Sequence, residues 1–364
     1  MQKTDELYMT EWKTYRLGDI LNFRRGHDLP KTDMVNGEIP VAGSNGIIGY
    51  HNVSTPIEPC ITIGRSGNVG TPYIYDKCWA HNTVLYVDDF KGNDPLYLYY
   101  LLKTIPLASY GGGSAVPTLN RNHIHPIEIK HTPSLEEQRR IAEILGAIDD
   151  KIENNRRIND NLEQQAQALF EEIFFSDNDW EYTTLGMLTE EVKTKVRGMD
   201  AKVLSPISSG ELVLSEDYFT KQVYSQDISK YIVVEPMSFA YNPARINIGS
   251  IGINSFDFVG CVSPVYVVFK TKCEYENYLR LFVKSDVFKE EVKSRAIGGV
   301  RQTLSYQDFA MITTKYPPIE SIRTFNTQYN KLLGIINYNN TENRSLATLR
   351  DTLLPKLMNG EIKL

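Results

Sequence analysis

The sequence predicts an α+β protein in which two β-rich domains, in a pseudo-two-fold arrangement, are separated by two long helices that form an antiparallel coiled coil. Three observations carry this prediction: an internal repeat, short β-branched runs within each repeat, and a heptad pattern that follows each of them. A chain of 364 residues is long enough for two domains. We expect the domains at 1–132 and 177–317, the central helix at 133–176 and the C-terminal helix at 318–364.

The composition is that of a soluble globular protein, with 41% hydrophobic and 23% charged residues. No apolar run approaches the ~20 residues of a membrane span. The first residues lack the apolar core of a signal peptide, so we expect a cytoplasmic protein without a membrane partner. The cysteines stand far apart with no CxxC pair, which favours buried thiols over a disulfide framework or a zinc site; they are Cys60, Cys78, Cys261 and Cys273.

The net charge of -6 argues at first against a nucleic-acid partner, but the charge is unevenly distributed. Residues 1–132 carry 12 basic and 13 acidic groups, and residues 177–317 carry 16 and 18. Both segments are therefore nearly neutral, and each can present a locally basic face. Bulk charge does not decide the question.

The internal repeat begins with a Trp followed five and six residues later by Leu-Gly, in "EWKTYRLGDI" (11–20) and "DWEYTTLGML" (179–188). Further along, Thr118-Leu119 recurs as Thr303-Leu304, an offset of 185 (303 − 118), and Pro133 recurs as Pro318 at the same offset. Between them, "GRSGNVG" (64–70) has a looser counterpart in "ARINIGSIG" (244–252). Each half therefore runs as a globular segment followed by a helical one.

The globular segments are predicted to be rich in strands. Runs such as "CITIG", "TVLYVDD", "KYIVVE" and "PVYVVFK" alternate with Gly, Asn and Pro turns. A helix is expected at 94–105, with a counterpart at 275–294. Ser134 is the expected N-cap of the central helix, with Glu137 as its capping-box partner.

Both long helices carry a heptad seam, in which apolar or Asn residues recur with spacings of four and three. In the central helix the seam is Ile141, Leu145, Ile148, Ile152, Asn155, Asn159, Leu162, Ala166, Leu169 and Ile173. In the second it is Phe325, Tyr329, Leu332, Ile336, Asn339, Asn343, Leu346, Arg350, Leu353 and Leu357. Only the change from Ala166 to Arg350 departs from the shared pattern.

Two asparagines lie at the centre of each seam. In an antiparallel pair Asn155 faces Asn343 and Asn159 faces Asn339, which gathers all four in one layer that fixes the register of the helices. In a parallel pair Asn155 would face Asn339 instead. The antiparallel pairing places the two globular segments at opposite ends, so we favour it. The competing interpretation is two unrelated amphipathic helices, each packed on its own domain.

The sequence resembles the specificity subunit of type I restriction–modification systems over essentially its whole length. The resemblance is carried by the "W…LGD" start, by "GGGSAVPTLN" leading to "PSLEEQRRIAEILGAIDDKI", and by "LLPKLMNGEI", together with the repeat. It implies that the globular segments are target-recognition domains for double-stranded DNA and that the helices are spacers. It further implies assembly with two methyltransferase subunits and, for cleavage, with motor-nuclease subunits, in a DNA adenine methyltransferase or site-specific deoxyribonuclease complex.

The residues themselves indicate no catalytic site, cofactor site or metal site. There is no G-x-x-x-x-G-K-[ST] loop for ATP, and "YNPAR" (241–245) departs from the Asn-Pro-Pro-aromatic motif of adenine methyltransferases at Ala244 and Arg245. "GRSGNVG" is not a nucleophile elbow, because Gly67 follows Ser66 directly. His123 and His125 could share a face of a strand, but ordinary polar or turn roles are favoured over metal binding.

Candidate DNA contacts are polar side chains beside glycines in loops, where the backbone can approach a phosphate or a base edge. Tight turns without a ligand are about equally expected for any single loop. In the first domain the candidates are Arg24, Arg25, His27, Ser44, Asn45, Arg65, Ser66, Asn68 and Ser114. In the second they are Arg245, Asn247, Arg301 and Gln302, with Lys193, Lys195 and Arg197 as phosphate contacts or a solvated face.

Two alternatives to a restriction–modification subunit are a protein scaffold or orphan DNA-binding module, and an enzyme with a site between the domains. The missing catalytic motifs disfavour the enzyme, and neighbouring genes would discriminate between the other two. The low net charge predicts weak DNA binding by the chain alone and tight binding after assembly. Phe170, Phe174 and Phe175 are expected either to dock partner helices or, slightly favoured, to pack on the neighbouring domain.

Overall fold

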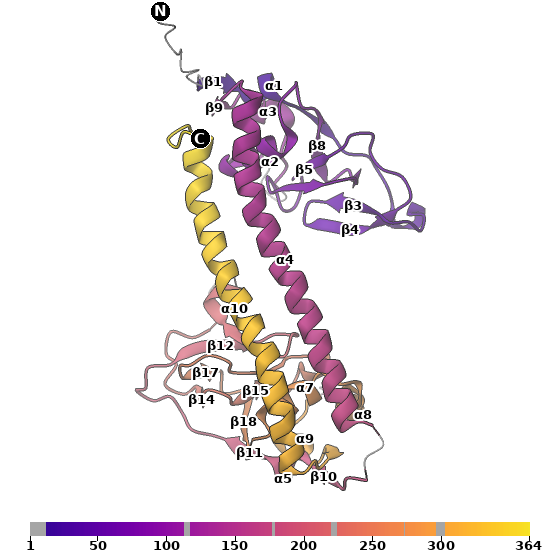
Figure 1. Cartoon of the computed structure of the whole chain (residues 1–364), viewed down its shortest axis with the longest axis vertical. Coiled ribbons are helices and arrows are strands. Elements are labelled where there is room, and N and C mark those ends of the chain that lie inside the picture. The colour runs from indigo at the N-terminus through magenta and orange to yellow at the C-terminus, as the bar shows by residue number, and fades with distance from the viewer. Residues whose placement is uncertain (1–11, 113–116, 177–178, 220–223, 273, 296–302) are drawn as a thin grey trace, which may run out of the picture. The chain divides into compact units, whose positions relative to one another are not determined.

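The structure is a computed structural model that describes residues 12–112, 117–176, 179–219, 224–272, 274–295 and 303–364. It is an α+β fold, as predicted, and divides into two compact units (Figure 1). Unit 1 comprises Met1–Arg157 and Asn339–Leu364, and unit 2 comprises Ile158–Tyr338. Each unit thus holds one globular segment and part of both long helices. The four-segment division of the sequence stays a prediction.

Unit 1 is built on a four-stranded antiparallel sheet in the order β2-β8-β5-β6, beside a three-stranded sheet in the order β4-β3-β7 and a β1–β9 pair. Its elements are β1 (Lys13–Arg16), α1 (Leu17–Ile20), β2 (Asn22–Arg25), η1 (Lys31–Asp33), β3 (Ile39–Gly43), β4 (Gly46–His51), β5 (Cys60–Gly64), β6 (Pro72–Tyr75), β7 (Trp79–Ala80), β8 (Val84–Asp89), α2 (Pro95–Thr104), η2 (Leu107–Tyr110), α3 (Arg121–Ile124), β9 (Glu128–His131) and the first part of α4 (Leu135–Phe174).

The core of unit 1 lies between the larger sheet and the helices. Alternate residues of β5, Ile61 and Ile63, point into it and are fully buried, as the two-residue period of a strand requires. Leu98 of α2 and Leu145 of α4 complete this cluster, together with residues from the end of α10. The expected helix at 94–105 is confirmed as α2, which Asp94 caps by accepting the N–H of Tyr97 at 2.9 Å.

Unit 2 has two four-stranded sheets, in the orders β11-β18-β15-β16 and β13-β12-β17-β14, and a β10–β19 pair. Its elements are β10 (Tyr182–Thr184), α5 (Leu185–Leu188), β11 (Thr189–Val192), β12 (Lys202–Pro206), β13 (Leu212–Leu214), α6 (Ser215–Tyr218), β14 (Ile232–Val234), β15 (Phe239–Tyr241), η3 (Ile246–Ile248), β16 (Ile251–Ile253), β17 (Gly260–Val262), β18 (Val267–Thr271), α7 (Glu276–Phe282), α8 (Asp286–Arg295), α9 (Tyr306–Ala310), β19 (Thr313–Lys315) and the first part of α10 (Ile319–Met358).

The internal repeat is confirmed at the level of strand pairing. The order β11-β18-β15-β16 in unit 2 reproduces β2-β8-β5-β6 in unit 1, and the β10–β19 pair reproduces β1–β9. β3 pairs antiparallel with β4 and parallel with β7; β12 pairs in the same two ways with β13 and β17. The loops between these matched strands can therefore be compared, whereas β14 of unit 2 has no counterpart in the three-stranded sheet of unit 1.

Within unit 1, α4 and α10 pair antiparallel. Asn155 donates its side-chain N–H to Asn343 at 2.9 Å, and Arg350 forms an ion pair with Asp149 at 2.7 Å, so residue numbers rise along α10 as they fall along α4. The parallel alternative, with Asn155 facing Asn339, does not occur. Ser134 caps α4 as expected, since its hydroxyl accepts the N–H of Glu137 at 3.3 Å, but Glu137 does not complete the expected capping box, because the Ser134 N–H donates to the Thr132 hydroxyl at 3.3 Å.

Within unit 2, Phe170 and Phe174 of α4 are fully buried and pack against Phe325 of α10, with ring centroids 6.0 and 5.1 Å apart. These two phenylalanines belong to the core of their own unit, so the slightly favoured interpretation, packing on the neighbouring domain, is confirmed for them. The pattern at 275–294, by contrast, is two helices, α7 and α8. The helix is interrupted after Phe282, and α8 starts after Ser285, whose hydroxyl caps it by accepting the N–H of Phe288 at 3.2 Å.

The cysteine prediction needs one correction. Cys60 and Cys78 form a disulfide within unit 1, where we expected separate thiols. The two residues are 18 apart in sequence and become neighbours because β5 and the segment before β7 pack together, which their spacing alone does not indicate. Cys261 is a buried free thiol, as expected, and burial raises its pKa to about 11. Cys273 lies outside the described residues.

Candidate nucleic-acid interface

The 64–70 loop of unit 1, between β5 and β6, is closed by its own backbone. Gly70 donates to the carbonyl of Gly64 at 2.8 Å, and Gly67 and Gly70 have φ angles of 86° and 82°, a region that favours glycine. Arg65 and Ser66 are half-buried, while Asn68 is exposed. The glycines therefore shape a compact turn that presents polar side chains at its surface.

Three further segments of unit 1 meet this loop. The N–H groups of Arg65 and Ser66 donate to the carbonyl of Thr83 at 2.8 and 3.2 Å, and Leu119 donates to the carbonyl of Arg65 at 2.8 Å. A Cβ placed on Gly67 would lie 3.4 Å from the hydroxyl of Ser44, so the β3–β4 turn lies alongside. The structure thus brings together Ser44, Asn45, Arg65, Ser66 and Asn68.

A chain of contacts joins β2 to the same region. Arg65 donates to the backbone carbonyl of Asn82 at 3.5 Å, the Asn82 side chain donates to Asp28, and Asp28 lies 3.8 Å from Arg25. The Arg25–Asp28 pair is exposed, so it contributes little stability and the guanidinium can exchange onto a phosphate.

Arg24 and His27 lie beside Tyr86. The imidazole of His27 is 5.7 Å from the Tyr86 ring and 5.5 Å from the Trp79 ring. Burial raises the pKa of Tyr86, whereas the neighbouring Arg24 guanidinium opposes that rise. Arg24 is exposed, which leaves it accessible to a ligand, while His27 is half-buried and its backbone N–H donates to Ala80 at 2.7 Å.

In unit 2, Arg245 and Asn247 are exposed on the η3 turn between β15 and β16, the counterpart of the 64–70 loop. Gly249 ends this turn with a φ of 84°, and a Cβ placed there would lie 3.5 Å from the Cα of Ser208. The two loops that meet in unit 1 therefore also meet in unit 2.

The basic run after β11 is a separate feature. Lys193 forms an ion pair with Glu191 at 2.7 Å. The backbone of Lys195 forms an antiparallel β-bridge with Ile232, and the N–H of Arg197 donates to the carbonyl of Ser229 at 2.9 Å. Arg197 has a φ of 54°, and all three basic side chains are exposed. The contacts of Lys195 and Arg197 hold the run along the 228–232 segment. Ser114, Arg301 and Gln302 lie outside the described residues.

Ser208 and Ser209 were not among the DNA contacts predicted from the sequence. They occupy the β12–β13 turn, which matches the β3–β4 turn with Ser44 and Asn45, and each turn contains a glycine in the left-handed region, Gly46 at 96° and Gly210 at 84°. The signal was the shared "S-x-G", whose offset of 164 (208 − 44) is close to the 168 of the Trp…Leu-Gly repeat (180 − 12) but differs from the 185 of Thr118-Leu119 and Thr303-Leu304.

The histidines of α3 have structural surroundings. His125 accepts the backbone N–H of Phe23 at 3.1 Å, and burial lowers its pKa. The pair lies on a short helix and its C-cap, not on a strand. Within the described ranges, no group of three or more His, Cys, Asp or Glu side chains could hold a metal ion. None of the helices that the structure describes is long and apolar enough to cross a bilayer.

Comparison with known proteins identifies the class. Residues 9–164 match the family model for the type I restriction modification DNA specificity domain. The MjaIX type I restriction enzyme specificity subunit of Methanocaldococcus jannaschii is 27% identical, over 73% of this chain and 69% of that protein. The HindI specificity subunit of Haemophilus influenzae is 26% identical, over 63% of this chain and 68% of its own length.

A crystal structure of a type I restriction–modification S subunit from M. genitalium matches with a TM-score of 0.63, covering 98% of both chains at 17% identity, which supports the fold. Residues 9–164 thus match a type I restriction modification DNA specificity domain, and the resemblance to type I specificity subunits drawn from the sequence is confirmed. The chain as a whole is a relative of type I specificity subunits.

Proposed function

We propose that the chain reads a bipartite, asymmetric double-stranded DNA target, with each unit contacting one half. The observation that carries this proposal is the duplicated strand order, which places equivalent loops in both units but gives them different side chains. Equal scaffolds with unequal loops suit a target made of two dissimilar half-sites.

The chemistry of the loops supports DNA as the ligand. In unit 1 the exposed groups are guanidinium and amide donors such as Arg24 and Asn68, and in unit 2 they are Arg245 and Asn247. Arg and Asn side chains bind guanine and adenine edges in the major groove, and both also bind phosphates. The glycines in the same loops permit close approach of the backbone.

The long helices are proposed to set the gap between the half-sites. α4 and α10 are each 40 residues long, and both continue from one unit into the other. A seam of 33 residues from Ile141 to Ile173 corresponds to about 50 Å at ~1.5 Å per residue. On duplex DNA that is roughly 14 base pairs, from ~34 Å per turn.

Assembly with two methyltransferase subunits, and with motor-nuclease subunits for restriction, is part of the proposal. The chain then supplies recognition, and its partners supply adenine methylation and cleavage. Exposed apolar side chains on the long helices support protein docking: Ile144 and Leu349 in unit 1, and Ile158, Ile335 and Tyr338 in unit 2.

Methylation profiling of the host genome tests the proposed function. We expect a bipartite motif with a constant unspecified gap and one modified adenine in each half, lost when this gene is deleted and restored by the intact gene. A continuous motif, or a motif that survives the deletion, would contradict the proposal. A scaffold without a DNA target would leave the methylation pattern unchanged.

A further inference from the structure

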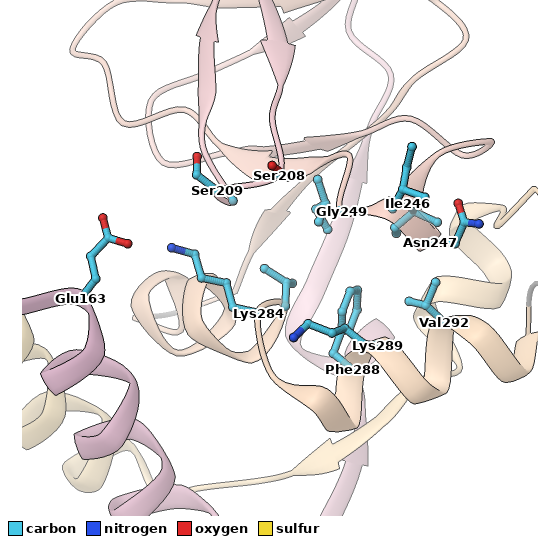
Figure 2. Close-up of a pocket in the computed structure, with 14 residues that line it drawn as sticks. Glu163, Ser208, Ser209, Ile246, Asn247, Gly249, Lys284, Phe288, Lys289 and Val292 are labelled. Atoms are coloured by element: carbon cyan, nitrogen blue, oxygen red, sulfur yellow. The ribbon is translucent and has the colours of Figure 1, made fainter. Parts of the chain in front are cut away.

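Unit 2 contains a cavity of about 480 Å³ next to its recognition loops (Figure 2). Its apolar wall includes Ile246, Phe288 and Val292, of which Phe288 is 2% exposed. Its polar rim consists of Glu163, Ser208, Ser209, Asn247, Lys284 and Lys289. The rim therefore combines the η3 turn, the β12–β13 turn and the segment between α7 and α8.

Lys284 is the distinctive cation of this rim. It is half-buried, and its side chain crosses the β12–β13 turn so closely that a Cβ on Gly210 would lie 2.6 Å from its Cε. Lys289, by contrast, pairs with Asp286 at 2.9 Å. Lys284 forms no ion pair among the described residues, so its ammonium group is available to an anion.

The turn that carries Ser208 and Ser209 is held from behind. Arg280, which is 6% exposed, donates to Glu211 at 2.6 and 3.0 Å, and Ser255 donates to the same carboxylate at 2.7 Å. Two guanidinium N–H groups on one carboxylate oxygen of Glu211, with the Ser255 hydroxyl on the other oxygen, fix the backbone that follows Gly210. The two serine hydroxyls are thus held at the edge of the cavity.

The matching place in unit 1 is arranged differently. There, Gly70 packs directly on η2, and a Cβ on it would lie 2.6 Å from the backbone nitrogen of Ala108. In unit 2 the nearest atom to a Cβ on Gly249 is 3.5 Å away, and α8 takes the place of η2. The cavity is therefore a feature in which unit 2 differs from unit 1.

We propose that this cavity binds a phosphodiester of the DNA half-site read by unit 2. Lys284 donates to the phosphate, the hydroxyls of Ser208 and Ser209 add hydrogen bonds, and the apolar wall contacts the sugar. This inference rests on the proposed function. Glu163 of α4 lies on the side toward which the Lys284 side chain extends (Figure 2), so its negative charge competes with the phosphate, and Arg280 nearby partly offsets that charge.

The test uses the full-length chain assembled with its methyltransferase subunits and a DNA duplex carrying the methylated motif. Single phosphodiesters are replaced in turn by neutral methylphosphonates, and binding is measured over a range of salt concentrations. Lys284→Gln should weaken binding about tenfold and lower the salt slope by about 1. Lys293→Ala, an exposed lysine on the following helix α8 and outside the cavity lining, is the matched control and should bind like the wild type.

The methylphosphonate scan gives the decisive comparison. Replacing one particular phosphodiester, in one half-site only, should lower the DNA affinity of the wild type about tenfold. The same replacement should hardly change the affinity of the Lys284→Gln variant, because that variant has already lost the contact. Glu163→Gln should strengthen binding. Unchanged affinity of Lys284→Gln, or equal loss at every position, would overturn the inference. Failure of the wild-type complex to bind the motif would instead refute the proposed function.

Discussion

At the scale of single residues, His131 of β9 shows how burial shapes the chemistry of unit 1. It is 2% exposed and lies between Tyr15 and Tyr97, with ring centroids at 5.2 and 5.7 Å. The Tyr97 hydroxyl is 3.3 Å from its Nδ1. Burial lowers the pKa of His131 to about 4, so the folded protein holds it neutral at physiological pH.

Acidification should therefore destabilise unit 1 through His131. Its folded pKa of about 4 lies below the ~6.5 of an unfolded His, so this stability is fully present above pH ~6.5 and is lost as the pH falls toward 4. The loss should reach roughly 2–3 kcal/mol. Urea unfolding between pH 7.5 and 4 measures it, for wild type and His131→Gln.

The exposed His123 provides the control for this experiment. His123→Gln should keep the wild-type pH dependence, whereas His131→Gln should flatten it. Equal slopes for wild type and His131→Gln would show that other groups govern the acid transition.

Glycine patterns in the sequence locate candidate loops, whereas groups that only tertiary contacts bring together cannot be located from the sequence, and the DNA contacts themselves stay predictions. Ser44 and Arg65 stand beside glycines, and the structure brings them together. Ser208 was hidden because the turn lengths of the two repeats differ. Lys284 could not be found, since nothing in its sequence context shows that its ammonium group lies beside a cavity.

At the scale of elements, the paired helices explain the one seam position that broke the heptad pattern. Arg350 occupies a place where apolar or Asn residues are otherwise found, and it pairs with Asp149 at 2.7 Å. Asp149 also accepts the Tyr100 hydroxyl at 2.8 Å and lies 3.8 Å from Lys103. The sequence predicted the seam, but it could not predict this network, because Asp149 lies outside the seam positions.

Breaking this network should destabilise unit 1. Asp149→Ala leaves Arg350 partly buried without its main partner and removes the acceptor of Tyr100, so we expect a loss of about 1–2 kcal/mol. Adding Arg350→Leu should recover part of the loss, since an apolar residue restores the seam. Thermal unfolding of the single and double variants measures both effects.

Arg323→Ala is the comparison variant, because Arg323 pairs with Glu320 and Glu274 at the exposed surface of unit 2. It should leave the unfolding temperature unchanged. If Asp149→Ala behaved like Arg323→Ala, the network would have no structural role.

At the scale of the whole molecule, the duplication and the two seams were predictable because repeated motifs and a regular period survive in the sequence. The borders of the compact units were not. They fall inside α4 at 157 and inside α10 at 338, where neither helix shows a break in sequence or structure. They follow from long-range packing of each helix half.

Lengthening the paired helices tests their proposed role as a spacer. Four residues inserted after Asn155 in α4, with four more inserted before Asn343 in α10, add about 6 Å to the pair. Methylation profiling should then show unchanged half-sites and a gap longer by about two base pairs.

The control replaces four exposed residues of the same stretch by alanine without changing the length, and its gap should equal that of the wild type. Altered half-sites in the lengthened chain would contradict the spacer role, because the recognition loops are the same in both chains.

The division of the chain into units also dictates an order of events during synthesis. Unit 2 is one uninterrupted stretch, 158–338, whereas the core of unit 1 needs Leu354, Leu357 and Met358 from the end of α10. Although its strands leave the ribosome first, unit 1 must wait for the last segment of the chain before its core can close. Unit 1 is thus synthesised first but completes its core last, and its exposed apolar core is prone to aggregation in that interval.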